Sequence, residues 1–187
     1  MEAEGIARYI MKEMRLFPLE EKKDWDQFVA KMEEVSGSVK VAIVGKYTVG
    51  QQCADPMEDA YLSIRESLKH AGIEAGVRPE IVWIDAEDLE HGSSDLILRE
   101  ADGILVPGGF GSRGTEGKIK AVQYAREMKV PYLGICFGMQ LAVIEYARNV
   151  CGLEGAGSTE FGETPHPVIA ILPEQEKIRQ MGATMRL

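Results

Sequence analysis

The sequence is poor in the residues that build disulfide frameworks and metal sites. It has three cysteines among 187 residues, Cys53, Cys136 and Cys151, and no C-x-x-C pair. This spacing excludes a disulfide framework and a zinc site of paired cysteines, so we expect no metal in this domain. No apolar run of about 18 residues occurs, and no basic segment leads into an apolar one near the start. We therefore expect a soluble, cytoplasmic protein with no membrane partner.

Basic residues are also in the minority. Acidic residues outnumber them 30 to 21, and the formal net charge is -9. This balance argues against nucleic acid as a general partner. The hydrophobic share of 45% and the charged share of 27% are typical of a globular chain, long enough for one α/β domain with an appended segment.

Residues 1–38 have a different pattern from the rest of the chain. Apolar residues recur at helical spacing on both sides of Phe17-Pro18, which predicts two amphipathic helices. Ser36-Gly37-Ser38 is then a linker, and the main domain covers residues 39–187. Two such helices cannot bury their apolar faces alone. Either they pack on the following domain, or they are the remnant of a domain missing from this chain.

From residue 39 onward, apolar β-branched runs alternate with helical patterns. Strands are predicted at 39–45, 81–85, 103–107, 132–135 and 168–172, and helices at 57–71, 94–100, 116–129 and 137–150. This order predicts an α/β fold, an open, mostly parallel, doubly wound sheet with helices on both faces. Ligand sites in such sheets lie beyond the carboxyl ends of the strands.

Cys136 lies at the tip of a predicted strand–turn–helix segment, with Gly134 and Gly138 two residues to either side. Glycines at these positions allow a sharp turn where a Cβ would clash. The pattern is that of a nucleophile elbow with cysteine in place of serine, and the helix N-terminus favours a thiolate. The alternative is an unreactive cysteine buried at the start of a helix.

A nucleophilic thiolate also needs donors for an oxyanion and a base. The Phe137 N–H is one candidate donor, and the loop after the third strand, with Gly108 and Gly109, offers another. A phosphate loop is the alternative, but neither glycine-rich phosphate motif is present. The chain has three histidines. His70 lies at the end of the predicted helix that Gly72 stops, where a cation is favourable in its own right. His91 lies in a loop beyond the second predicted strand, and His166 has no nearby acid in register. None of the three is identified as the base.

Residues 107–111 and 134–140 resemble the class I (triad-type) glutamine amidotransferases, which have a flavodoxin-like fold. Segments 44–47, 59–63, 113–117, 158–161 and 182–187 narrow the resemblance to the glutaminase domain of CTP synthases. Residues 1–35 resemble the end of the synthetase domain of those enzymes, which favours the remnant interpretation.

The resemblance implies that Cys136 attacks the side-chain amide of L-glutamine and releases ammonia. A synthetase domain, which holds ATP and Mg, would use the ammonia to aminate UTP to CTP, in an enzyme that GTP activates and that forms homo-oligomers. The implied site residues are Gly108, Gly109 and Phe137 for the oxyanion hole; Phe110, Gln140, Glu160 and Arg186 for glutamine; and Arg113 and Glu116 for the lid that responds to GTP. A zwitterionic substrate does call for one carboxylate and one guanidinium.

Two departures from the family pattern stand out. Residues 48–58 form a longer segment than is usual and contain Cys53, which we interpret as an incidental thiol. In the family the base and its orienting acid lie in a His-Pro-Glu segment beyond the equivalent of Leu187, so we expect a truncated and nearly inactive chain. An amidotransferase of another pathway, a γ-glutamyl hydrolase and a non-catalytic module that binds glutamine or a partner remain as alternatives.

Overall fold

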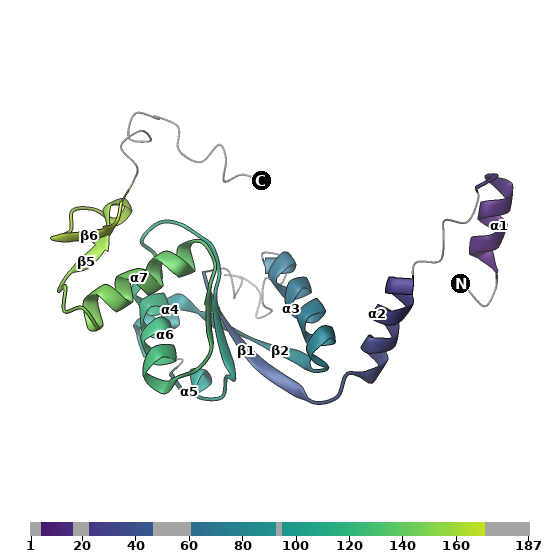
Figure 1. Cartoon of the computed structure of the whole chain (residues 1–187). Helices are drawn as coiled ribbons and strands as arrows, with labels where there is room; N and C mark the ends of the chain where they lie inside the picture. The colour runs from purple at the N-terminus through teal and green to yellow at the C-terminus, as the bar shows by residue number, and fades with distance from the viewer. Residues whose placement is uncertain (1–4, 17–22, 47–60, 93–94, 171–187) are drawn as a thin grey trace.

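The computed structural model describes residues 5–16, 23–46, 61–92 and 95–170 (Figure 1). Its centre is a sheet of four parallel strands in the order β2-β1-β3-β4. The strands are β1 (Ser38–Gly45), β2 (Arg78–Asp85), β3 (Gly103–Val106) and β4 (Tyr132–Gly134). The first four predicted strands are therefore confirmed, and β2 begins three residues earlier than predicted.

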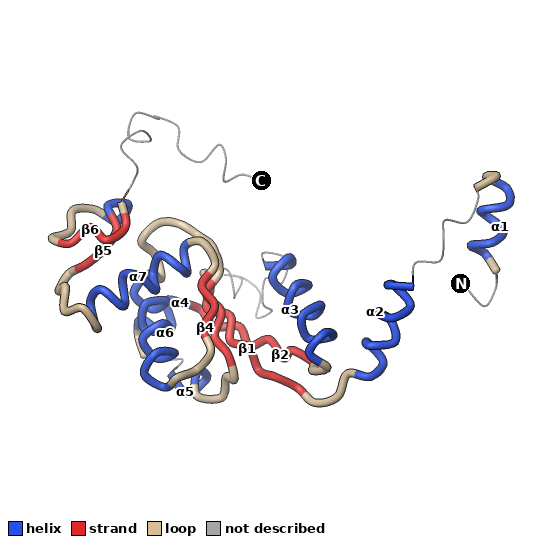
Figure 2. Tube along the Cα trace, viewed as in Figure 1, coloured by secondary structure: helices blue, strands red, loops and turns tan. Residues whose placement is uncertain are grey.

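Helices lie on both faces of this sheet, as the sequence predicts. Figures 1 and 2 show α3 (Leu62–Ala75) on one side, and α4 (Ala86–Glu90), α6 (Thr115–Met128) and α7 (Phe137–Asn149) on the other. Ala42 and Val44 of β1 point to the α4–α6 side and pack with Ala121 of α6. Because side chains alternate along a strand, Ile43 points to the opposite side, and it is also fully buried.

A smaller unit follows α7. Strands β5 (Ala156–Ser158) and β6 (His166–Ile169) pair in parallel, with the 3₁₀ turn η2 (Thr159–Phe161) between them. Ile144 of α7 packs in a second apolar cluster that includes residues of η2 and β6. The predicted strand at 168–172 is found two residues earlier, while β5 and α4 were not predicted. Residues 171 and 172 lie outside the described part of the chain.

The helix predicted to stop at Gly72 continues to Ala75, and the cap is Gly76 with φ of 68°. Gly72 serves a different purpose, because a Cβ on it would lie 2.6 Å from the carbonyl oxygen of Val77. This close approach between helix and strand requires glycine. Because α3 continues to Ala75, His70 lies inside the helix and not, as predicted, at its end.

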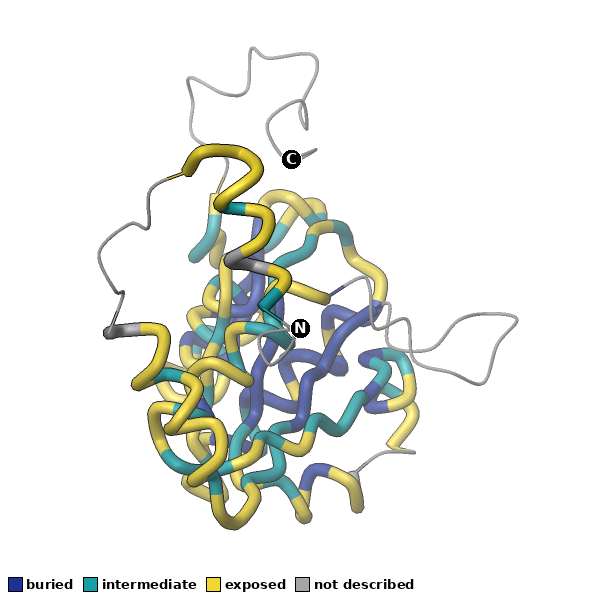
Figure 3. The backbone as a smooth tube through the Cα atoms, turned by 90° about the vertical axis from the view of Figure 1, so that its right-hand side faces the viewer, coloured by how far each residue is buried: buried dark blue, intermediate teal, exposed yellow. Residues whose placement is uncertain are grey.

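The N-terminal segment contains α1 (Ile6–Glu13) and α2 (Lys23–Glu34), as predicted. The ring of Phe28 on α2 meets the ring of His70 on α3 edge to face, at a centroid distance of 5.7 Å. Trp25 nevertheless remains 62% exposed, and Figure 3 shows exposed residues along these helices. The helical character is confirmed, and the domain boundary at residue 38 stays a prediction. Across the described ranges, no helix is both long and apolar enough to span a bilayer.

Candidate active site at the carboxyl end of the sheet

Cys136 occupies a strained position between β4 and α7. Its backbone has φ of 52° and ψ of -104°, and it is the N-terminal cap residue of α7. A positive φ in a residue with a Cβ costs roughly 1–3 kcal/mol, and such strain clusters at functional sites. The thiol-bearing residue is exposed. These features match a nucleophile elbow and exclude the alternative of a buried structural cysteine.

The two glycines that flank the turn are required by packing. A Cβ on Gly134 would lie 2.6 Å from the backbone nitrogen of Met139, and one on Gly138 would lie 2.1 Å from the carbonyl oxygen of Val106. Both distances are far inside van der Waals contact with backbone atoms that cannot rotate away. The predicted reason for glycine at these two positions is confirmed.

The loop after β3, residues 107–111, lies beside the elbow and is called the glycine loop below. A Cβ on Gly108 would be in ordinary contact with the Cβ of Cys136, at 3.6 Å. Phe137 is buried and is the first residue of α7, so its N–H is one of the helix-terminal donors that have no partner within the helix. The structure thus brings together Cys136, the glycine loop and the N-terminus of α7.

Two side chains hold this loop through hydrogen bonds to its backbone. The Lys46 Nζ, just after β1, donates to the carbonyl oxygens of Phe110 at 2.6 Å and Gly111 at 3.2 Å. The Gly111 N–H donates to Glu160 Oε1 at 2.9 Å. Burial lowers the pKa of Lys46, and the nearby Arg113 charge adds to that effect. Sequence reasoning assigned no role to Lys46, although its place directly after a buried strand is a signal for this edge of the sheet.

Comparison with known proteins identifies the family. The family model described as glutamine amidotransferase class-I matches residues 57–187. The chain belongs to this family. Its sheet is accordingly the open parallel α/β sheet of class I amidotransferases, as predicted.

Within the amidotransferase family, the chain is similar to CTP synthases. It is 74% identical over 187 residues to the CTP synthase of Methanothrix thermoacetophila, and 49% identical over 190 residues to that of Pyrococcus furiosus. Each alignment covers 100% of this chain and 34% of the relative, so the chain spans about a third of the length of these relatives. A solved glutaminase domain of Trypanosoma brucei CTPS with bound acivicin aligns with a TM-score of 0.64 and 42% identity, covering 74% of this chain and 52% of that one.

The glutamine-binding residues predicted for this amidotransferase are partly brought together. Glu160 meets the glycine loop through Gly111, and Phe110 lies in that loop, 61% exposed. Gln140 lies one turn into α7, where its backbone N–H donates to the Cys136 carbonyl oxygen at 3.2 Å. Arg186 lies outside the described residues. The roles of these side chains remain predictions.

The two predicted lid residues point to different partners. Arg113 forms an ion pair with Glu87 of α4 at 3.1 Å, and its guanidinium also reaches the Lys46 carbonyl oxygen at 3.5 Å. Glu116 lies in the first turn of α6 and pairs with Arg148 of α7 at 2.9 Å. Arg113 is therefore adjacent to the residues that hold the glycine loop, whereas Glu116 ties α6 to α7.

The three histidines lie on three different elements. His70 contacts Phe28 from α3, His91 caps α4, and His166 starts β6. Across the part of the chain that the structure describes, no hydrogen bond joins a histidine to the Cys136 thiol. No group of three metal-ligating side chains forms within the same residues.

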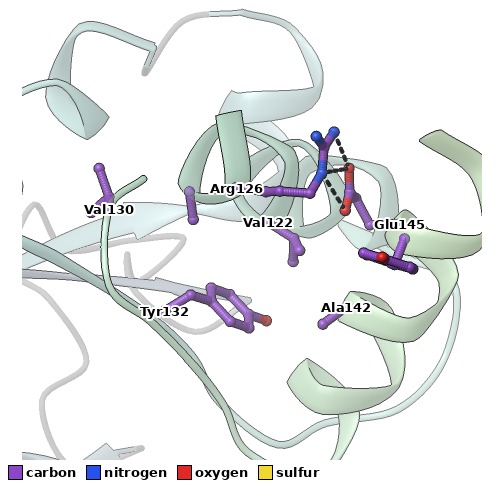
Figure 4. Close-up of a pocket in the computed structure, with 8 residues that line it drawn as sticks. Val122, Arg126, Val130, Tyr132, Ala142 and Glu145 are labelled. Carbon is purple, nitrogen blue, oxygen red and sulfur yellow. Dashed lines mark hydrogen bonds and ion pairs between the residues drawn. The ribbon is translucent and has the colours of Figure 1, made fainter. Parts of the chain in front are cut away.

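A separate cavity of about 250 Å³ lies between α6, β4 and α7, and none of its lining residues is a predicted site residue (Figure 4). It is lined by Val122, Ala125, Arg126, Val130, Tyr132, Ala142, Glu145 and Tyr146. The Arg126 guanidinium is bound to the buried Glu145 carboxylate at 2.8 Å along one side. The Tyr132 hydroxyl donates to the Gly138 carbonyl oxygen at 2.8 Å, which links this cavity to the first turn of α7. Burial raises the pKa of Tyr132, so this hydroxyl stays a donor.

Proposed function

We propose that this chain is the glutamine-hydrolysing part of a CTP synthase, with Cys136 as the nucleophile. The observation that carries the proposal is the strained backbone of Cys136 at the N-terminus of α7, with Gly108 of the glycine loop beside it. Strain of this kind aims a reactive side chain out of the sheet edge.

The chemistry follows from these positions. The Cys136 thiolate attacks the carbonyl carbon of the glutamine side-chain amide and forms a tetrahedral oxyanion. The Phe137 N–H and the backbone of Gly108 and Gly109 stabilise that oxyanion. The C–N bond then breaks, the nitrogen takes up a proton and leaves as ammonia, and a γ-glutamyl thioester remains. Water attacks the thioester carbon, glutamate is released, and the thiol is regenerated.

Recognition of glutamine is assigned by charge. The Glu160 carboxylate binds the α-ammonium group, the Arg186 guanidinium binds the α-carboxylate, and Gln140 and Phe110 line the pocket. Glu160 supports this assignment because it already lies at the glycine loop. The ammonia would pass to a synthetase domain that uses ATP and Mg to aminate UTP, and GTP would act on the loop that carries Arg113.

Labelling with acivicin, the compound bound to the Trypanosoma brucei glutaminase domain, tests the nucleophile. We expect mass spectrometry to find the adduct on Cys136 and not on Cys53 or Cys151, and excess glutamine to protect Cys136. The Cys136→Ser variant is the control and should not be labelled. Equal labelling of all three cysteines would mean that Cys136 is an ordinary thiol, and the proposal would be rejected.

Glutamine turnover by the 187-residue chain alone should be slow. Its three histidines lie on α3, at the end of α4 and on β6, and the described residues provide no base that is hydrogen-bonded to Cys136. Loss of the base from such a triad lowers the rate by several orders of magnitude. A steady-state ammonia assay measures this, and turnover near that of an intact CTP synthase would contradict it.

A further inference from the structure

The side chain of Lys118, near the start of α6, is buried with 0% of its surface exposed. Its Nζ atom has no hydrogen-bond partner among the described residues. Lysine is almost never fully buried unless it is paired, because an isolated ammonium loses its hydration without compensation. This arrangement lowers the stability of the fold, so a role in packing alone does not account for it.

The position of the ammonium is specific. The Nζ atom lies 5.3 Å from the ring centroid of Phe137 and would be 3.7 Å from a Cβ on Gly109. These are the two residues whose backbone faces the reacting centre in the proposed function. Because Gly109 has no side chain, none lies between the Lys118 ammonium and the backbone of the glycine loop.

The charge state of Lys118 follows from its neighbours. Burial lowers its pKa to about 8, and the Lys46 charge at the end of β1 acts in the same direction. Asp85, at the end of β2, opposes this effect. Lys46 lies over the same phenyl ring, at 5.7 Å from its centroid. Near neutral pH the amine is therefore mostly protonated. A positive charge thus lies beside Gly109 and Phe137, and no described residue is hydrogen-bonded to it.

We propose that Lys118 is a positioning residue whose buried ammonium acts through Gly109 and Phe137 to stabilise the oxyanion formed at Cys136. A fixed charge in a water-excluded site acts strongly on charge that develops nearby, because the site needs no reorganisation. The inference rests on the proposed function, since it assigns Lys118 to that reaction. The inference gives a part in the reaction to a residue that makes no contact with the substrate.

A purely structural role makes a different prediction for the kinetics. If Lys118 only filled space under Phe137, Lys118→Met would leave the kinetics unchanged or would lower stability and activity together. If its charge serves the reaction, Lys118→Met removes an unpaired buried charge, so the melting temperature should hold or rise while the activity falls. A fall in kcat without a fall in melting temperature separates the two explanations.

The experiment uses the intact CTP synthase of the proposed function, with the variants Lys118→Met, Lys118→Arg and Lys120→Met. Lys120 is on the same helix but is exposed, and its Nζ donates to the Leu89 and Glu90 carbonyl oxygens, so it controls for loss of a charge from α6. Glutamine hydrolysis is measured from about pH 6.5 to 9.5, a range that spans the region in which Lys118 titrates, together with thermal unfolding.

For Lys118→Met we expect kcat to fall about tenfold near pH 7, with KM for glutamine within about twofold and no fall in melting temperature. Lys118→Arg should recover most of kcat, and Lys120→Met should match the unmodified protein. The kcat of the unmodified protein should decline through about pH 8 as Lys118 loses its proton, and this decline should be absent in Lys118→Met.

Two results would overturn the role of Lys118 and leave the proposed function standing. One is an unchanged kcat in Lys118→Met. The other is a lower kcat with a lower melting temperature in Lys118→Met and no recovery in Lys118→Arg. Absence of both acivicin labelling at Cys136 and ammonia release in the unmodified protein would instead refute the proposed function, and the role of Lys118 with it.

Discussion

Gly138→Ala tests the backbone packing that holds the nucleophile. The added Cβ would lie 2.1 Å from the Val106 carbonyl oxygen, so α7 and β3 must separate by roughly 1 Å to accept it. Overpacking of this kind costs typically about 1–3 kcal/mol, and backbone atoms on both sides place this site near the upper end. Replacing a helical glycine by alanine returns up to about 1 kcal/mol. The expected net loss in the free energy of unfolding is therefore about 2 kcal/mol.

Thermal and urea unfolding followed by circular dichroism measure this loss. For a domain of this size, about 2 kcal/mol corresponds to a fall in melting temperature of roughly 6 °C. Gly103→Ala in β3 is the matched control, because a Cβ there would lie 3.8 Å from the nearest atom outside its chain neighbours. It should change the stability by less than about 1 kcal/mol. If Gly138→Ala unfolds at the same midpoint as the unmodified protein, α7 does not pack on the β3 backbone and the elbow geometry described above is incorrect.

Three further predictions concern charged residues of the same fold. Arg126→Met should lower the urea midpoint of unfolding, because it leaves the Glu145 carboxylate, 1% exposed, without its ion pair. The double variant with Glu145→Met should regain most of this loss. The pKa of Lys118 is about 8 in the folded protein and 10.5 for an unperturbed lysine, so the unfolded chain binds more protons between these pH values. The free energy of unfolding should therefore rise by up to about 3 kcal/mol from pH 8 to 10.5. Lys118→Met should abolish that rise. Lys46→Met removes both hydrogen bonds from Nζ to the loop carbonyls and should slow acivicin labelling of Cys136 about tenfold. Labelling of the exposed Cys151 by a general alkylating reagent should not change.

The sheet was predictable because its strands are continuous apolar runs that only a doubly covered parallel sheet can bury. The short helix α4 was missed because five residues carry too little periodicity, although Asp85 gave a local signal. Its side chain accepts a hydrogen bond from the Glu87 N–H and caps the helix. Gly72 was misread as a helix stop because the sequence does not show that Val77 approaches the helix so closely.

The residues of the candidate site also fall into those that the sequence predicts and those that it does not. Cys136 and its flanking glycines were predictable because the turn is local and its pattern covers a short run of consecutive residues. The contacts of Lys46 and Lys118 were not, because they depend on which strands are neighbours and on how α6 lies over the loop. A lysine in a sequence is also, on average, a solvated residue, so nothing local marks one that is buried.

The Val106 carbonyl group has a mechanical consequence for the site. It accepts the Ile135 N–H at 3.0 Å, it lies against Gly138, and the glycine loop follows it directly along the chain. The nucleophile and the loop are thus both tied to one peptide group at the end of β3. A displacement of β3 along its axis would carry both of them together and leave their separation unchanged. Changes elsewhere in the domain can therefore alter access to the site without spoiling the alignment between the thiol and the loop.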